Sequence, residues 1–197
     1  MATSSETLRA FVAVELPEDV LAAVGRARRS LETRLAARAV RWTRPEGIHL
    51  TLKFLGDTPA ASVPEIERRL QEALAGIPTF TLGLAPLGVF PNAHAPRVVW
   101  IGLSGDLPSL HAVRERVEEA IVPLGYPDDG RPFSPHLTLG RVADFASPSD
   151  RRDVGAAVAE ASPPPQVGFE VREVSLIRSE LGPGGARYTR LCAVALG

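Results

Sequence analysis

Four residues occur twice in this chain, as His49-Leu50-Thr51-Leu52 and as His136-Leu137-Thr138-Leu139. The second copy begins close to half a chain length after the first, in a chain of 197 residues. Each copy also holds one of only four histidines. This pattern predicts a duplicated unit, in which two similar half-structures bring the two copies face to face.

Each copy is predicted to be a β-strand with one polar and one apolar face. Successive side chains of a strand point to opposite sides, so His49 and Thr51 share a face, and so do His136 and Thr138. The leucines between them point the other way, toward a core. A helix would separate residues two positions apart by about 200°. The strand interpretation is therefore preferred.

Hydrophobic periodicity predicts strands and helices around both motifs. Further strands are expected at 8–16, 80–89, 97–103, 167–178 and 187–196, with a short extended piece at 40–42. The first motif strand is expected to stop at Gly56-Asp57. Helices are expected at 18–39, 62–75, 106–122 and 148–161. The segments 80–89 and 97–103 are expected to form a hairpin, and Gly182-Pro183-Gly184-Gly185 is expected to be the loop that joins the last two strands.

Composition excludes several classes of protein. Hydrophobic residues make up 45% of the chain and charged residues 23%, as in ordinary globular domains. A net charge of −1 argues against a non-specific nucleic-acid coat, but not against a local basic pocket for a phosphate. The single cysteine, Cys192, is expected to be buried and inert, and it excludes an internal disulfide or a cysteine-based zinc site. No segment has the length of a membrane span, and a cytoplasmic location is expected.

Two imidazoles opposed across a cleft, each beside a hydroxyl, suit chemistry on a phosphodiester. In-line attack at phosphorus needs a base on the incoming oxygen and an acid on the leaving oxygen, and histidine can be either near neutral pH. Threonine hydroxyls can donate to the non-bridging phosphoryl oxygens. No metal is required, and two histidines are too few ligands for an ordinary catalytic zinc site. The alternative is that the motif is simply a good β sequence used twice.

With these motifs and their flanks, the chain resembles the two-histidine (2H) phosphoesterase superfamily. Within that superfamily it is most similar to the bacterial and archaeal RNA 2′,3′-cyclic phosphodiesterases, also called 2′-5′ RNA ligases. The resemblance extends over nearly the whole chain in the expected order. It rests on residues 9–17, 40–42, 49–56, 97–100, 135–141 and 175–179.

The resemblance implies a bilobal, pseudo-twofold α+β fold in a single domain over 1–197. Each lobe would have an antiparallel sheet with outer helices, and the active cleft would lie between the lobes. One lobe would contain both chain ends and the other the middle of the chain. The implied activity opens a 2′,3′-cyclic phosphate at an RNA 3′ end to leave a 2′-phosphate, without a metal or other cofactor. The partner would be RNA with such an end or a small cyclic nucleotide, bound by a monomer that has no contact with membranes.

Residue roles are also implied by the resemblance. His49 would be the proton donor to the departing 3′-oxygen, and His136 would accept a proton from the attacking water. Thr51 and Thr138 would hold the phosphate, and Arg141 would support it.

Strand alternation predicts the faces of two basic residues that follow the motifs. Strict alternation puts Arg141 on the face opposite His136, so it reaches the cleft only if the strand ends or bulges, for which Gly140 is a reasonable place. Lys53 shares the parity of His49, about 13 Å further along a strand. It is expected either to meet the RNA backbone at the rim or to be a plain surface lysine.

The other aromatic residues and histidines are expected to have no role in catalysis. Core packing is preferred to base stacking for Phe11, Trp42 and Trp100, and His94 and His111 are expected at the surface without a role. Two alternative functions remain open: 2′-5′ ligation at the same site, and a non-catalytic module that binds phosphate or a nucleotide. The complete pair of motifs argues against the binding module.

Overall fold

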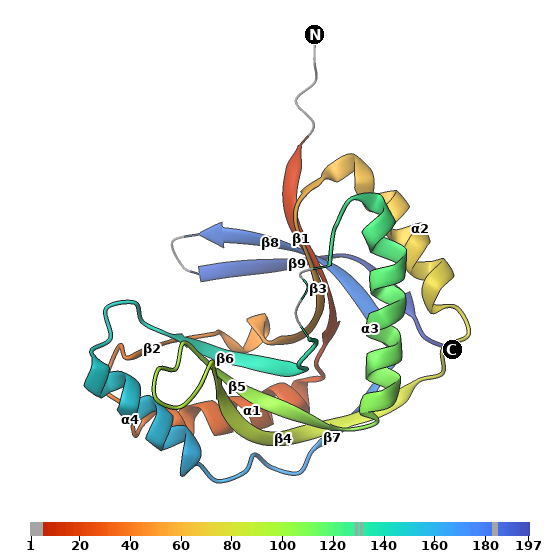
Figure 1. The fold of residues 1–197 in the computed structure, drawn as a ribbon. Helices are drawn as coiled ribbons and strands as arrows, with labels where there is room; N and C mark the ends of the chain where they lie inside the picture. Colours follow the sequence, from red (N-terminus) through yellow and green to blue (C-terminus); the bar gives the residue numbers. More distant parts are fainter. Residues whose placement is uncertain (1–5, 129, 131, 183–184) are drawn as a thin grey trace.

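A computed structural model of the chain describes residues 6–128, 130, 132–182 and 185–197. Over these residues the chain forms nine strands and four α-helices (Figure 1). The strands are β1 (Thr7–Glu15), β2 (Val40–Trp42), β3 (His49–Pro59), β4 (Phe80–Phe90), β5 (Val98–Gly105), β6 (His136–Val142), β7 (Gly168–Val171), β8 (Glu173–Gly182) and β9 (Gly185–Ala195). The helices are α1 (Glu18–Glu32), α2 (Val63–Leu74), α3 (Leu107–Ile121) and α4 (Pro148–Ala159).

The described strands make one antiparallel sheet with the order β7-β4-β5-β6-β3-β1-β8-β9, and β2 pairs with β6 beside this path. The order is symmetric about the contact between β6 and β3, the two motif strands. Four strands lie on each side, with β5 next to β6 and β1 next to β3. The antiparallel, pseudo-twofold α+β fold expected from the sequence is confirmed.

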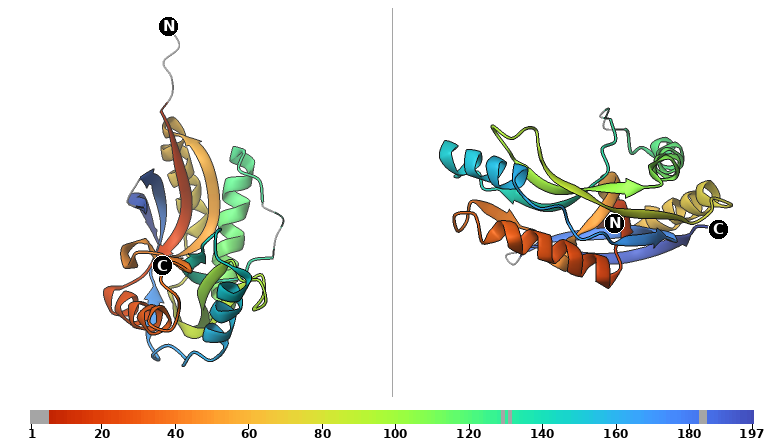
Figure 2. Two further views of the ribbon diagram at one scale, coloured as in Figure 1. Left: turned by 90° about the vertical axis from the view of Figure 1, so that its left-hand side faces the viewer. Right: turned by 90° about the horizontal axis from the view of Figure 1, so that it is seen from below.

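The helices form two pairs at opposite ends of the molecule (Figures 1 and 2). In one pair α2 packs on α3, and these helices contact β9 and β3 respectively. In the other pair Arg34, just after α1, donates to the carbonyl of Ala157 in α4 and forms an ion pair with Glu160 at 2.8 Å. Helices α1 and α3 therefore each lie on the half of the sheet that does not contain the strand before them. In the described part of the chain, none of the helices has the length and apolar character needed to cross a bilayer.

A row of apolar side chains crosses the centre of the sheet. Leu50 is paired with Val14 of β1 on one side and with Leu137 of β6 on the other, and Leu137 is paired with Ile101 of β5. All four are at most 2% exposed. Burying each such side chain stabilises the fold by about 1.5–3 kcal/mol relative to exposure. This row is the apolar face predicted for the motif strands, so their polar residues lie on the opposite face.

Two predicted boundaries in the first half of the chain are wrong. The helix predicted at 18–39 ends at Glu32. The chain then turns back to β2, and Arg38 takes a positive φ of 75° in that turn, which no helix allows. The first motif strand does not stop at Gly56-Asp57 but continues to Pro59, because Gly56 accommodates a φ of 70° within the strand.

The second half of the chain also departs from prediction in detail. The strand predicted at 167–178 is divided at Arg172 into β7 and β8, because the first part pairs with β4 and the second with β1. The hairpin of β4 and β5 is confirmed. Pro183 and Gly184, in the predicted loop, lie outside the described residues. Cys192 is partly rather than fully buried, and this burial raises the pKa of its thiol, which disfavours the reactive thiolate.

Candidate active site

The buried leucine pair between β3 and β6 fixes the positions of the four motif side chains. In antiparallel register, the residue after one leucine faces the residue before the other. His49 therefore lies beside Thr138, and Thr51 beside His136. In a regular pair, facing Cβ atoms are about 4.5–5.5 Å apart and diagonal ones about 7–8 Å apart. The two His/Thr pairs predicted from the sequence thus share one partly exposed face, with the histidines on a diagonal.

His49 is held between two aromatic rings. Its ring stacks on Phe11 of β1 with centroids 4.5 Å apart, and it meets Tyr188 of β9 edge-on at 5.1 Å. Burial lowers the pKa of His49 from its ordinary value of 6.5 to about 4, although a hydrogen bond to the Gly47 backbone and the charge of Glu15 raise it. Because the Gly47 contact raises the pKa, the imidazole is the donor in that bond. In the free protein His49 is therefore neutral at neutral pH.

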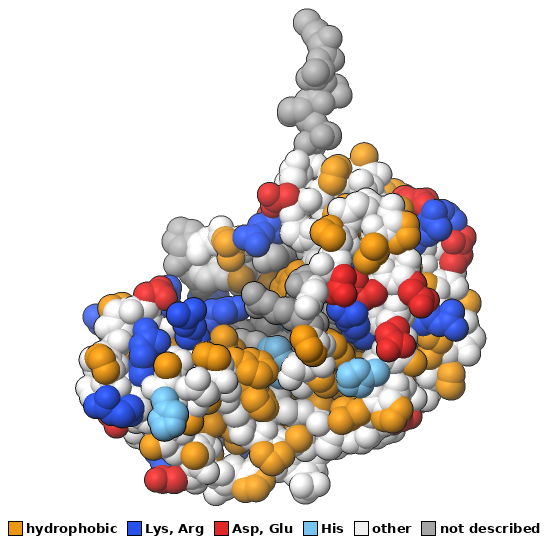
Figure 3. Space-filling model, in the orientation of Figure 1, with side chains coloured by type: hydrophobic (Ala, Val, Ile, Leu, Met, Phe, Trp, Pro, Cys, Tyr) orange, Lys and Arg blue, Asp and Glu red, His pale blue; other side chains and the backbone are white. Residues whose placement is uncertain are grey.

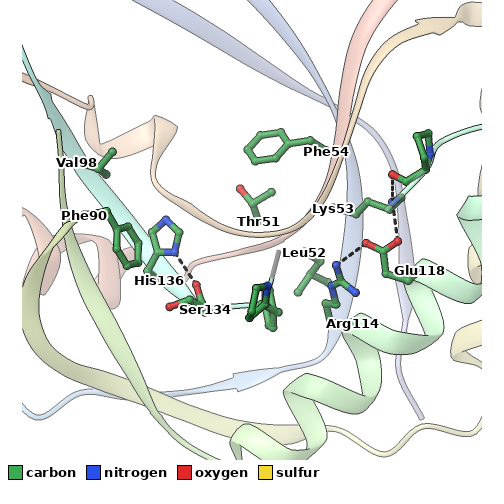
Figure 4. A pocket seen from close by; sticks show the side chains of 13 residues that line it. Thr51, Leu52, Lys53, Phe54, Phe90, Val98, Arg114, Glu118, Ser134 and His136 are labelled. Carbon is green, nitrogen blue, oxygen red and sulfur yellow. Dashed lines mark hydrogen bonds and ion pairs between the residues drawn. The ribbon is translucent and has the colours of Figure 1, made fainter. Parts of the chain in front are cut away.

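His136 has an equivalent environment in the other half of the sheet. Its ring meets Phe90 of β4 edge-on at 5.1 Å and lies 6.4 Å from Trp100 of β5. Its Nδ1 donates to the carbonyl of Ser134 at 2.7 Å, since a carbonyl oxygen can only accept (Figure 4). Each motif histidine thus bonds to the backbone two residues before it. In His136 this leaves Nε2 as the ring nitrogen that can act on a substrate.

A β-bulge follows both motifs at the same position. Strand β1 pairs with Thr51 and then with Lys53, and it skips the leucine between them. Strand β5 pairs with Thr138 and then with Gly140, and it skips the equivalent leucine. An extra residue in a strand reverses the alternation of side chains beyond it. Residues after each bulge therefore change faces.

The bulge in β6 brings Arg141 to the face of the histidines. Its side chain is exposed, and its charge acts on Tyr188: burial raises the pKa of the phenol, and Arg141 opposes that rise. Glycine is required before Arg141, because a Cβ on Gly140 would lie 2.9 Å from the carbonyl oxygen of Arg41 on β2. The sequence predicts that Arg141 reaches the cleft only if the strand ends or bulges near Gly140, and the structure has that bulge.

The bulge in β3 exchanges the faces of Lys53 and Phe54, so both expectations for Lys53 are wrong. Lys53 is 5% exposed, with its Nζ 2.7 Å from Glu118 Oε2 and 3.0 Å from the carbonyl oxygen of Pro127. Phe54 is 68% exposed. Figure 4 shows Phe54 above Thr51, and Lys53 directed toward Glu118. An aromatic ring therefore occupies the position in the first half that Arg141 occupies in the second.

A cavity of about 460 Å³ opens beside the second motif. His136 and Thr51 line it together with three aromatic rings, those of Phe54, Phe90 and Phe133. Its volume is typical of sites for small organic ligands. Among the residues that the structure describes, no group of three or more His, Cys, Asp or Glu side chains is arranged to hold a metal ion.

His49 does not line this cavity. It borders a smaller one of about 110 Å³, with Glu15, Tyr188 and Arg190. The strand register, rather than a shared cavity, is what brings the two histidines together.

The remaining candidate residues have mainly structural surroundings. Phe11 is 3% exposed as expected, but the group it packs on is His49. Trp42 packs against the main core, and Trp100 lies against Phe90. His94 and His111 are at the surface, as predicted. Sequence reasoning missed the aromatic partners Tyr188 and Phe90, because each belongs to a strand remote in sequence from the histidine that it contacts.

Comparisons with known proteins agree with this geometry. The family model described as the 2′-5′ RNA ligase superfamily matches residues 10–183. An RNA 2′,3′-cyclic phosphodiesterase of Methanothermobacter thermautotrophicus is 34% identical over 182 residues, which cover 92% of this chain and 95% of that protein. The crystal structure of TT0787 of Thermus thermophilus superposes with a TM-score of 0.77 at 29% identity, over 96% of this chain and 98% of that one. The crystal structure of E. coli LigT complexed with 3′-AMP superposes with a TM-score of 0.76 at 27% identity, over 97% of this chain and 99% of that one.

Proposed function

The chain belongs to the 2′-5′ RNA ligase superfamily, and we propose that it is an RNA 2′,3′-cyclic phosphodiesterase. It opens a 2′,3′-cyclic phosphate at an RNA 3′ end and leaves a 2′-phosphomonoester. The observation that supports this most directly is the pairing of β3 with β6, which puts two imidazoles and two hydroxyls on one face, each histidine beside the threonine of the other motif. Relatives that span nearly the whole chain carry this activity in their names.

The reaction needs one proton removed and one supplied. His136 takes a proton from water through Nε2 while the water oxygen forms a bond to phosphorus. The bond from phosphorus to O3′ breaks, and His49 gives its proton to O3′. The two histidines thereby exchange protonation states, and solvent restores them. Acid or base catalysis by a positioned histidine contributes a factor of about 10²–10⁴ in rate.

His49 must carry a proton before it can donate one. Its low pKa in the free protein keeps it neutral near pH 7. A bound phosphodiester brings a negative charge next to the ring, and a nearby opposite charge favours the imidazolium form. The substrate itself therefore prepares its proton donor.

Thr51, Thr138 and Arg141 hold the phosphate. The hydroxyls donate to the non-bridging oxygens, where negative charge increases in the transition state, and the guanidinium adds a charge-assisted hydrogen bond. We also propose that the chain is a single two-lobed domain, with this site between the lobes. The monomeric state, the cytoplasmic location and the independence from cofactors stay predictions.

The test is hydrolysis of a short oligoribonucleotide that ends in a 2′,3′-cyclic phosphate, in EDTA, with the phosphate position of the product determined by NMR. We expect a 2′-phosphate. His49→Ala and His136→Ala should each lower kcat by about 10²–10⁴. His94→Ala, at an exposed histidine in the loop between β4 and β5, is the matched control and should be fully active. Full activity in either motif variant would refute the proposal, a longer product would indicate ligation, and tight binding without turnover would favour a binding module.

A further inference from the structure

A second groove adjoins the site on the side of Arg141. It has a volume of about 880 Å³ and lies between β2, β6, α4 and the hairpin of β8 and β9. Its described lining contains four arginines but one carboxylate, Asp144. The arginines are Arg41, Arg97, Arg141 and Arg151. In Figure 3, Lys and Arg side chains gather over this part of the molecule, although the whole chain has a net charge of −1.

These guanidinium groups are only partly neutralised by the protein. Arg41 forms an ion pair with Asp144 at 2.6 Å. Arg151 donates to three backbone carbonyls of the groove wall and so supports the wall. Within the described residues, neither Arg97 nor Arg141 has a carboxylate at ion-pair distance. Two positive charges in the groove are therefore available to an anion.

The strand register places two of the four arginines of the groove side by side. Arg41 of β2 and Arg141 of β6 are directly paired residues, so their side chains leave the sheet on the same face. Like charges in facing positions destabilise a sheet. The ion pair of Arg41 with Asp144 offsets part of this repulsion, and an anion bound beside Arg141 would relieve the rest.

On the basis of the proposed function, we propose that this groove binds backbone phosphates of the RNA strand on the 5′ side of the cyclic end. Arg141 connects the two sites, because it lies on the histidine face and also lines the groove. A free cyclic nucleotide has its single phosphate at the reaction site and places nothing in the groove. An RNA end adds one phosphate for each upstream residue, and each phosphate neutralised by arginine releases counterions. The enzyme therefore acts on RNA ends in preference to cyclic mononucleotides.

The test compares kcat/KM for a cyclic-phosphate-ended oligoribonucleotide with that for the matching 2′,3′-cyclic mononucleotide. Arg97 is chosen because it is exposed and takes no part in the proposed chemistry. At low salt, Arg97→Ala should lower kcat/KM for the oligonucleotide about fivefold or more and leave the mononucleotide value unchanged. It should also reduce the slope of log kcat/KM against log salt by about 0.7, the value for one phosphate of a single strand. Arg97→Lys should retain most of that slope.

Arg116→Ala is the matched control, since Arg116 is an exposed arginine of α3 that lies in a groove with Glu72 and Glu119. It should change kcat/KM for neither substrate. Equal losses on both substrates for Arg97→Ala, or no loss on either, would overturn the proposal. Fluorescence anisotropy with a labelled oligoribonucleotide ending in a 3′-hydroxyl measures the affinity of RNA for the groove without turnover. Binding weakened by Arg97→Ala in a protein that hydrolyses neither the cyclic-phosphate-ended oligonucleotide nor the mononucleotide would support the groove and contradict the phosphodiesterase activity.

Discussion

Leu50 and Leu137 are paired side by side where β3 meets β6, and neither is exposed to solvent. In the described part of the chain, this pair is the register contact between the two motif strands. It sets each motif histidine beside the threonine of the other motif. A phosphate bound on that face touches residues from both halves of the sheet, so the site is complete only when the halves are joined.

Gly140→Ala tests the bulge that carries Arg141 into the site. A Cβ at this position would lie 2.7 Å from Val40 Cγ1, and close to the β2 backbone as well, so the strands must move apart. We expect a loss of about 1–3 kcal/mol in the free energy of unfolding, measured in urea. We also expect a raised KM, because Arg141 moves with the strand. Gly168→Ala is the control, since its Cβ would meet ordinary contacts of 3.5 Å or more. Unchanged stability and KM in Gly140→Ala would contradict this account of the bulge.

The motif strands and the helices could be predicted because local spacing determines which face of an element is apolar. The bulges could not, because they arise from pairing with a neighbouring strand. Val12 and Ala13 of β1 face Lys53 and Thr51, and nothing in the motif itself reveals the residue skipped between them. Strict alternation therefore predicts the wrong face for Lys53. Arg141 could be treated correctly as conditional, because the preceding glycine marks a place where a strand can bulge.

The aromatic surroundings of the histidines have the same non-local origin. Phe11 and Tyr188, which both contact His49, come from opposite ends of the chain. Their strands β1 and β9 are brought near by the order of the sheet, which periodicity does not encode. The chemistry of the site was therefore predictable from two short motifs, whereas the environment that sets the pKa of His49 was not.

Lys53→Met tests the buried ion pair that replaces the expected surface lysine. The substitution leaves Glu118 with Arg114, at 2.7 Å, but without its second cation. Removing one partner of a buried pair typically costs about 3–5 kcal/mol in the free energy of unfolding. Denaturation in urea should show a loss of that order, and Lys53→Met combined with Glu118→Leu should lose less than the sum of the single variants. Additive losses would mean that the two charges are not coupled.

Phe54→Ala tests whether the exposed ring serves the substrate. Because Phe54 is 68% exposed, its removal should change the free energy of unfolding by no more than about 0.5 kcal/mol. Stacking of a base on an aromatic side chain is worth about 1–3 kcal/mol, so KM for an RNA end should rise about tenfold. Phe54→Tyr keeps an aromatic face and should retain the original KM. A large loss of stability in Phe54→Ala would show instead that the ring serves packing.

His49 should make the protein sensitive to mild acid. Its pKa is about 4 in the folded chain and near 6.5 when unfolded. Below about pH 6.5 the unfolded state binds a proton that the folded state does not, so stability falls as the pH drops toward 4 and levels off below it. The size of this loss is on the order of 3 kcal/mol. Urea denaturation across this range should show it in the native protein and in His111→Gln, but not in His49→Gln. An unchanged pH dependence in His49→Gln would assign the effect to another group.

Proton uptake on anion binding tests the assigned direction of proton transfer. Sulfate suits this test because it resembles a phosphate but does not titrate near neutral pH. If a bound anion raises the pKa of His49 from about 4 to above neutrality, binding takes up as much as one proton. Calorimetry near pH 7 in buffers of different ionisation enthalpy should detect that uptake in the native protein and lose it in His49→Gln. Binding without proton uptake would mean that His49 stays neutral beside the anion. It would then be suited to accept a proton rather than donate one, and the roles of His49 and His136 would have to be exchanged.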